Sequence, residues 1–269
     1  MLFLLFESKY LSYFKTAANL VIYSHTCILI ACSIMYVCFF VSMLRIKSCN
    51  FAFVKNDVSF GKMNFSYDVI DRRRADSHDA LAVRWHSPSG RVLDISNADL
   101  QHHSDVTAYY LRRMGVGVGS VVFLYGLERA FEFATVITAL GKLCAVPVVD
   151  LRLSPVERCN RLDAYCIIAH NSSSVVPVVD RSIMLFRSLE LKISVGYPYP
   201  RNWFDLHTGV RLAGTFRRPA DLPLHYTSLV VYDEQPIYYD ETYPFRVASN
   251  DYLWDKFFID MREGRPFEF

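Results

Sequence analysis

The stretch Met114–Asp150, MGVGVGSVVFLYGLERAFEFATVITALGKLCAVPVVD, contains one complete β–α–β pattern. Ser120–Tyr125 and Ala145–Val149 are apolar runs of strand length, and the first is bounded by glycine on both sides. Ala130–Leu143 lies between them and is apolar on nearly every face, which predicts a buried helix. Strands that are apolar throughout are typical of a parallel sheet with helices on both faces. The stretch therefore predicts an α/β fold.

Short apolar strands and helices continue to alternate downstream, which favours a doubly wound layer. We expect a helix that begins with Ser154 as its N-cap and Pro155 at its first position. The further elements predicted are strands at Cys166–Ala169, Val175–Val179 and Leu191–Val195 and a helix at Arg181–Leu189. Tyr197–Pro223 is rich in proline, arginine and aromatic residues, and we expect an irregular surface excursion there.

Upstream of the central unit, the pattern predicts a helix, a hairpin and a second helix. Asn64–Ala75 is expected to be helical, with Tyr67 and Ile70 turned inward. The turn sequence at Ser87–Gly90 predicts a hairpin between two short strands. Ser96 has the spacing of a capping box and is expected to begin a helix that runs to Met114.

Composition excludes several classes of protein. The chain has 269 residues, of which 52% are hydrophobic and 21% charged, so it can bury a sizeable core. Its net charge of +2 gives no basis for a nucleic-acid partner. Seven cysteines without a nearby C-x-x-C pair around Cys144, Cys159 or Cys166 indicate reduced thiols and no metal site.

The N-terminal segment has a different character. No Asp, Glu, Lys or Arg occurs between Lys15 and Arg45. Leu20–Leu44 is long enough to cross a bilayer, which takes roughly 20 apolar residues. We therefore expect residues 1–62 to be a membrane anchor and linker, and residues 63–269 a globular domain. The excess of basic residues after the segment predicts that the globular part lies in the cytoplasm. The alternative is that translation starts at Met63, which would make the protein cytoplasmic.

The segment ISNADLQHHSDVTAYYLRRMGVGVGSVVFLYGLERAFEFATVITALGKLCAVPVV resembles the amino-terminal core of the AMP-forming acyl-CoA synthetases. That core reads helix, G-x-x-x-G, strand, x-R-x-x-E-F, helix, K-L-G-A-V. Arg129, Glu132 and Phe133 match its middle, and Lys142 begins its end, where Cys144 replaces the glycine. The segments NFSYDVIDRRRADSHDALAVRW, RLSPVERCNRLDAYCII, RPADLPLHYTS and DETYPF extend the resemblance over about residues 64–254.

This resemblance implies a fold and a chemistry. The fold would be an incomplete doubly wound N-terminal domain of the adenylate-forming, AMP-dependent synthetase/ligase family, less than half of a full member. Family members use ATP and Mg to convert a carboxylate to an acyl-adenylate and pyrophosphate, and coenzyme A then displaces AMP. The family's phosphate-binding loop reads [Tyr/Phe]-Thr-Ser-Gly-Thr-Thr-Gly-x-Pro-Lys. Its glycines let the backbone approach the phosphates, which the hydroxyls and the lysine bind.

The chain departs from the family at this loop. Tyr226-Thr227-Ser228 matches its start, but LVVYDEQPI follows, without the glycines, the threonines or the lysine. The lysine position falls to Gln235 or, counted from the proline, to Ile237. Asp233 and Glu234 add negative charge, and a like-charge contact at roughly 4 Å costs on the order of 4 kcal/mol at an effective dielectric near 20. Thr227 and Ser228 are the residues to which the resemblance assigns a remnant ATP-binding role.

Three functions remain open at this point. The first is a truncated acyl-CoA synthetase-like protein that lacks adenylation activity, has no catalytic residues or cofactor of its own, and acts as a membrane-tethered interaction module. A protein partner would then cover the surfaces left free by the shortened domain. The second is an acyl-CoA ligase that is active alone or when complemented by another chain. The third is an unrelated binder or membrane protein.

Overall fold

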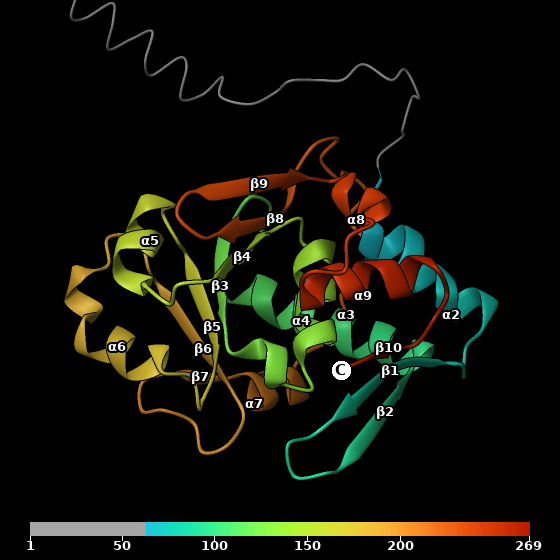
Figure 1. Cartoon of the computed structure of the whole chain (residues 1–269), viewed down its shortest axis with the longest axis horizontal. Coiled ribbons are helices and arrows are strands. Elements are labelled where there is room, and N and C mark those ends of the chain that lie inside the picture. The colour runs from blue at the N-terminus through green and yellow to red at the C-terminus, as the bar shows by residue number, and fades with distance from the viewer. Residues whose placement is uncertain (1–62) are drawn as a thin grey trace, which may run out of the picture. The chain divides into compact units, whose positions relative to one another are not determined.

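Two sheets and the helices around them make up residues 63–269, the part of the chain that the computed structural model describes (Figure 1). The larger sheet has the strand order β7-β6-β5-β3-β4-β8-β9, and the smaller one the order β10-β1-β2. No helix within residues 63–269 is long and apolar enough to cross a membrane. The predicted membrane segment, residues 20–44, lies outside the described residues.

The central β–α–β prediction is confirmed. β3 (Val121–Tyr125) and β4 (Val146–Asp150) pair in parallel and are connected through α4 (Phe133–Lys142). Nearly every residue of α4 is buried, as expected for a helix that is apolar on all sides. A short 3-10 turn, η2 (Leu127–Arg129), precedes the predicted helix, which begins at Phe133 rather than at Ala130.

The other strands of the large sheet extend it on both sides of this unit. They are β5 (Cys166–His170), β6 (Leu191–Val195), β7 (Phe204–Asp205), β8 (Thr227–Tyr232) and β9 (Pro236–Asp240). All pairings are parallel except that of β9 with β8, which is antiparallel. β9 lies at one edge of the sheet and the two-residue strand β7 at the other.

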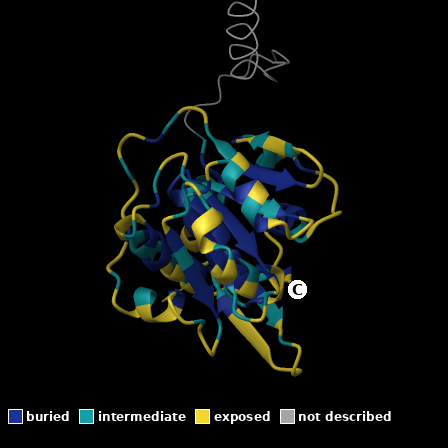
Figure 2. Cartoon of the chain, turned by 90° about the vertical axis from the view of Figure 1, so that its left-hand side faces the viewer, coloured by how far each residue is buried: buried dark blue, intermediate teal, exposed yellow. Residues whose placement is uncertain are grey.

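Helices cover both faces of the large sheet, and the core is therefore divided in two. One cluster contains Val122 and Leu124 of β3 with buried residues of α3 (Asn97–Arg113), α4 and α9 (Leu253–Arg262). The other contains Phe123 and Tyr125 with buried residues of α5 (Pro155–Arg161) and α6 (Val175–Arg181). Successive residues of β3 thus enter opposite clusters, and Figure 2 shows the buried strands between the two layers. This arrangement confirms the doubly wound prediction.

The small sheet and the opening helix also follow the sequence. β1 (Leu81–His86) and β2 (Val92–Ser96) form the predicted hairpin, and β10 (Phe267–Glu268) pairs with β1 in parallel. Ser96 and Asp99 make the complete capping box of α3. The opening helix is divided into a π-helical part, η1 (Ser66–Asp71), and α2 (Arg72–Asp76).

Two elements predicted after β5 are wrong. Val175–Val179 is not a strand but the start of α6, because Val175, Val176 and Val179 lie on one helical face that packs into the second cluster. The strand that pairs with β5 is instead β6, and Cys166 of β5 lies opposite Leu191 of β6. Burial thus overrides the strand preference of a valine-rich segment. The predicted helix Arg181–Leu189 is reduced to the 3-10 turn η3 (Ile183–Leu185).

The segment Tyr197–Pro223 is more regular than expected. It contains β7 and the helix α7 (Leu206–Arg211), whose N-cap Asp205 accepts hydrogen bonds from the backbone N–H groups of His207 and Thr208. α7 packs against α3, where Gly209 leaves the space that the ring of Tyr110 occupies. A short helix, α8 (Tyr243–Arg246), connects β9 to α9.

Candidate functional site at the carboxyl edge of the large sheet

The carboxyl ends of β4 and β8 lie side by side, with Asp150 in register with Tyr232. Open α/β sheets bind their ligands beyond the carboxyl ends of the parallel strands. This edge is therefore the place at which the fold would form a ligand site. The residues that follow the two strands decide what the site can bind.

Asp150 is the centre of a buried polar network at this edge. Its carboxylate accepts hydrogen bonds from the Tyr125 hydroxyl at 3.0 Å and from the backbone N–H groups of Arg152 and Ser154, each at 2.9 Å. Arg158 Nη1 lies 2.6 Å from Asp150 Oδ1, and both side chains of this ion pair are almost inaccessible. The predicted start of α5 is confirmed: Ser154 is the N-cap residue and Pro155 lies in the first turn, although the Ser154 side chain makes no capping hydrogen bond.

Arg158 also ties the network to the end of β8. Its guanidinium donates to the Tyr232 carbonyl oxygen at 2.6 Å and to that of Asp233, and it lies over the Tyr232 ring, 4.3 Å from the centroid. These bonds use both N–H groups of Arg158 Nη1 and one of Nη2. Arg158 thus has a structural role, in which it links Asp150 to the end of β8.

The turn between β8 and β9 closes the edge. It consists of Asp233, Glu234 and Gln235 and is exposed. Arg152 Nε donates to Asp233 Oδ1 at 2.6 Å and its Nη2 to Glu234 Oε1 at 2.9 Å. Arg161 Nη2 donates to Gln235 Oε1 at 2.6 Å. The turn is therefore short and held on both sides by arginine side chains.

Thr227 and Ser228 lie at the amino end of β8, away from the carboxyl ends of the strands. Both belong to the first part of β8, five and four residues before its carboxyl end. The Ser228 hydroxyl donates to the carbonyl oxygen of Asp240 at 2.6 Å, so it supports the β8–β9 hairpin. The two residues are thus separated from the Asp150 network by the length of the strand.

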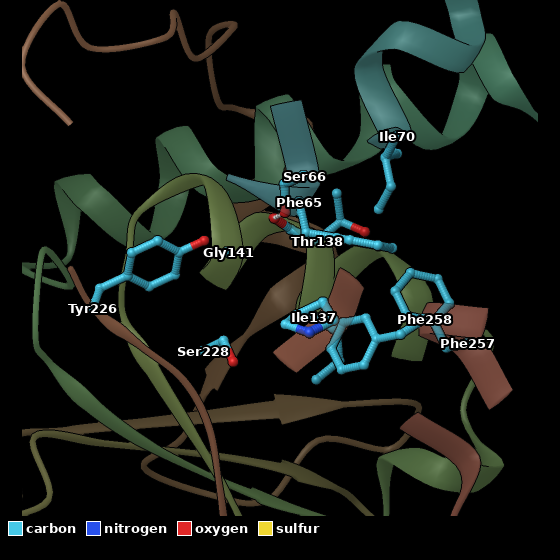
Figure 3. A pocket seen from close by; sticks show the side chains of 11 residues that line it. Phe65, Ser66, Ile70, Ile137, Thr138, Gly141, Tyr226, Ser228, Phe257 and Phe258 are labelled. Carbon is cyan, nitrogen blue, oxygen red and sulfur yellow. Dashed lines mark hydrogen bonds between the residues drawn. The ribbon is translucent and has the colours of Figure 1, made fainter. Parts of the chain in front are cut away.

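Ser228 also lines a small cavity of about 20 Å³, shown in Figure 3. The cavity holds about one water molecule. Apolar side chains of η1, α4 and α9 line it together with four polar residues, Ser66, Thr138, Tyr226 and Ser228. Burial raises the pKa of the Tyr226 hydroxyl. A nucleotide or an acyl group does not fit into this space.

The remaining titratable groups of the described residues form no metal site or reactive thiol. No group of three or more His, Cys, Asp or Glu residues within residues 63–269 has the geometry to hold a metal ion. Cys144, Cys159 and Cys166 are free and buried. Burial raises the pKa of the Cys144 thiol to about 11 and that of Cys159 to about 12, so both are protonated at neutral pH.

Comparison with solved structures assigns the fold. The chain is similar to an anthranilate CoA ligase in complex with anthranoyl-AMP, with a TM-score of 0.59 and 18% identity over 69% of this chain. It is also similar to a long-chain-fatty-acid CoA ligase from Archaeoglobus fulgidus, with a TM-score of 0.55 and 17% identity over 67% of this chain. This chain has an adenylate-forming, acyl-CoA synthetase-like fold.

The likeness is partial and structural. The chain spans 36% of the length of each of these two ligases. No protein-family model matches the sequence, and no curated protein matches it. The adenylate-forming fold is therefore carried by the arrangement of its elements rather than by close sequence identity.

Within the adenylate-forming fold, the matched motif residues have structural partners. Lys142 is fully buried and pairs with Asp105 at 2.6 Å and with Asp71 at 2.8 Å. Burial raises the pKa of Asp71 even though Lys142 acts in the opposite direction. Glu132 Oε1 lies 2.5 Å from His207 Nε2, and this hydrogen bond raises the pKa of His207. The sequence did not indicate any of these pairs, because their members are far apart in the chain.

The structure changes the interpretation of the segment that was matched by sequence to the family's phosphate-binding loop. Aligned by sequence, Thr227 and Ser228 start the loop, and Leu229–Ile237 follow. In the structure Thr227–Tyr232 is a strand, and the first residues beyond its carboxyl end are Asp233–Gln235. The acidic turn therefore follows the carboxyl end of β8, and the binding role of Thr227 and Ser228 stays a prediction.

Proposed function

We propose that residues 63–269 are a part of an adenylate-forming domain that does not bind the phosphates of ATP and does not adenylate a carboxylic acid by itself. In this proposal the chain is a truncated acyl-CoA synthetase-like protein and a pseudoenzyme without a cofactor of its own. The observation that carries the proposal is the turn Asp233–Gln235 at the carboxyl end of β8, where a phosphate-binding loop would have to lie.

The shape of this turn supports the proposal. A loop that cradles phosphates directs several backbone N–H groups at them and needs glycines for the close approach. The β8–β9 turn has three residues, none of them glycine, and leads directly into an antiparallel strand. It has neither the length nor the backbone freedom to surround a phosphate.

Charge supports the proposal as well. Asp233 and Glu234 present two carboxylates on the side from which a polyphosphate would approach. The basic group beside them, Arg152, already bonds to both carboxylates. Stabilisation of the charge that develops in phosphoryl or adenylyl transfer needs donors that are free to bind the phosphates. The turn has none.

The test is equilibrium binding of Mg·ATP to the full chain, measured by titration calorimetry. We expect no heat of binding up to millimolar nucleotide. The variant in which Asp233, Glu234 and Gln235 are replaced by the family loop Ser-Gly-Thr-Thr-Gly-x-Pro-Lys is the comparison, and the same measurement shows whether the site can be rebuilt. Binding by the unmodified chain would favour the alternative, an acyl-CoA ligase active alone or complemented by another chain.

The N-terminal segment adds a further part to the proposal. Leu20–Leu44 would anchor the protein in a membrane, with the globular part in the cytoplasm, and the domain would serve as a tethered interaction module. Removal of residues 1–62 is then expected to move the protein from the membrane fraction to the soluble fraction. If the full chain is itself recovered in the soluble fraction, the anchor is ruled out and the cytoplasmic alternative holds.

A further inference from the structure

The 3-10 turn η3 (Ile183–Leu185) places three consecutive apolar side chains on the surface. Ile183 is 37% exposed, Met184 91% and Leu185 61%. Single exposed apolar residues are ordinary on a protein surface, whereas an exposed run of three is unfavourable unless it has a function. The turn therefore calls for a functional explanation.

Contacts on its C-terminal side fix the shape of the turn. Asn160 of α5 donates from Nδ2 to the Leu185 carbonyl oxygen at 2.8 Å, and its Oδ1 accepts from the Arg187 backbone N–H, also at 2.8 Å. Phe186, between these two bonds, packs against the second cluster. Because Phe186 takes the inward position, the three side chains before it stay outside, and their exposure is built into the turn.

Two arginines flank the turn and give it a positive charge. Arg181 ends α6, Arg187 follows the turn on its other side, and both are exposed. Neither forms an ion pair within the described residues, and Asp180, the carboxylate next to Arg181, pairs instead with Lys192 at 2.8 Å. Glu190 is the one acidic residue in the sequence from 181 to 190. The segment therefore joins an apolar tip to a net positive charge.

We infer that η3 inserts into the surface of a membrane that contains anionic lipids, with Ile183–Leu185 at the boundary of headgroups and acyl chains. Arg181 and Arg187 would then lie among the headgroup phosphates. This inference rests on the proposed membrane role of the chain and adds a second contact to the proposed anchor. Apolar insertion and attraction to anionic headgroups reinforce each other at such a surface. Arginine suits this position, since its stem is apolar and its charged end reaches the headgroups.

The size of the turn favours a lipid surface over a protein partner. A stable protein interface buries about 800 Å² on each partner and takes about 20–30 residues a side. Three side chains on one turn supply a small part of that. Insertion into a membrane needs no matching partner surface, and an anchor in the same chain would raise the effective concentration of the turn at the membrane.

The experiment is photo-cross-linking of the full chain in phosphatidylcholine vesicles, with and without phosphatidylserine, and with benzoylphenylalanine in place of Met184. We expect lipid adducts on the peptide that contains residue 184, detected by mass spectrometry, and severalfold more of them when phosphatidylserine is present. The same probe at Leu212 is the control. Leu212 is 84% exposed and follows α7, which packs into the cluster on the other face of the large sheet. We expect at least fivefold fewer adducts there.

Charge reversal is the second arm. A basic residue near an anionic surface contributes about fivefold in binding. Arg181→Glu combined with Arg187→Glu is therefore expected to lower the adduct yield at position 184 severalfold on vesicles with phosphatidylserine. Arg211→Glu combined with Arg217→Glu is the matched control, because these arginines are exposed beside Leu212 and Phe216 on the other face. We expect no effect from it.

Three results would each overturn the inference. They are the absence of lipid adducts at position 184, equal yields from positions 184 and 212, and a yield that responds to neither phosphatidylserine nor the reversal of Arg181 and Arg187. Equal yields would mean that the anchor alone brings the domain to the lipids. The anchor and Mg·ATP binding are tested separately, so failure here is distinguishable from failure of the proposed function.

Discussion

At the residue scale, the buried ion pair of Asp150 and Arg158 stabilises the carboxyl ends of β4 and β8. Removing one member of a buried pair leaves the other charge uncompensated, at a cost of about 3–5 kcal/mol. We expect Asp150→Asn to lower the free energy of unfolding by an amount in that range, measured by urea denaturation. The matched control is Asp94→Asn, which breaks the exposed pair with Arg84. Equal losses from the two variants would contradict the structural role of the buried pair.

The pair formed by His207 and Glu132 predicts a pH dependence. The hydrogen bond that His207 donates to the Glu132 carboxylate raises the pKa of His207 above its ordinary value. The Asp205 carboxylate, with its Oδ1 at 3.8 Å from His207 Nδ1, acts in the same direction. A raised pKa of a histidine stabilises the fold below the unfolded-state pKa of about 6.5, and this contribution disappears as the pH rises through the folded-state pKa.

We therefore expect His207→Gln to lower the melting temperature more at pH 6 than at pH 9. Thermal denaturation of both proteins over this pH range provides the measurement. The variant His86→Gln is the control, since the partner of His86, Glu268, is 56% exposed and therefore screened by solvent, whereas Glu132 is 18% exposed. A difference between wild type and His207→Gln that does not vary with pH would be the contradicting outcome.

Single residues of the site were predictable only in part. The sequence alone shows that the glycines, threonines and lysine of the family loop are absent after Ser228. It also shows the negative charge of Asp233 and Glu234. The partners of those carboxylates were not, because Arg152 is about 80 residues away in sequence and meets them only through the parallel pairing of β4 and β8.

At the scale of elements, the turn between α3 and β3 offers a matched pair of glycines. Gly115 has a φ of +96°, and a Cβ there would lie 2.1 Å from the Tyr165 hydroxyl oxygen, which donates to the Met114 carbonyl at 2.8 Å. Gly117 lies in the same turn with open space around its Cα. Gly115→Ala is expected to cost about 2–4 kcal/mol, from a left-handed backbone and a steric clash. Gly117→Ala is expected to have little effect.

The measurement is the urea midpoint of the two variants. Similar midpoints would show that the turn tolerates a side chain at residue 115 and that the contact with Tyr165 does not fix the position of β3.

Elements were predictable where burial and local preference agree. The apolar segments of β3, α4 and β4 have the length and pattern of what they form, and the capping box at Ser96 is a local signal. The strand predicted at Val175–Val179 is wrong because the valines, which favour a strand, also fit one buried face of a short helix. α7 was missed because its packing on α3 depends on Gly209, whose role is visible only with Tyr110 in place.

For the molecule as a whole, the parallel sheet was predicted from the apolar runs and the alternation of strands and helices, and the fold is supported by the two ligase structures. The antiparallel closure by β9 was not foreseen, because in the sequence the residues after Ser228 read as an altered loop. We propose that this hairpin stands where a phosphate-binding loop would have to lie, and it therefore underlies the proposed lack of adenylation.

The most direct test of the proposed lack of adenylation is ATP–pyrophosphate exchange by the purified chain with magnesium and short-, medium- and long-chain carboxylic acids. Circular dichroism on the same sample establishes that the protein is folded. The account predicts exchange no greater than that of a heat-inactivated control. Exchange above that control, abolished by heating and dependent on the added acid, would contradict the proposal that the acidic β8–β9 turn has replaced a working phosphate loop.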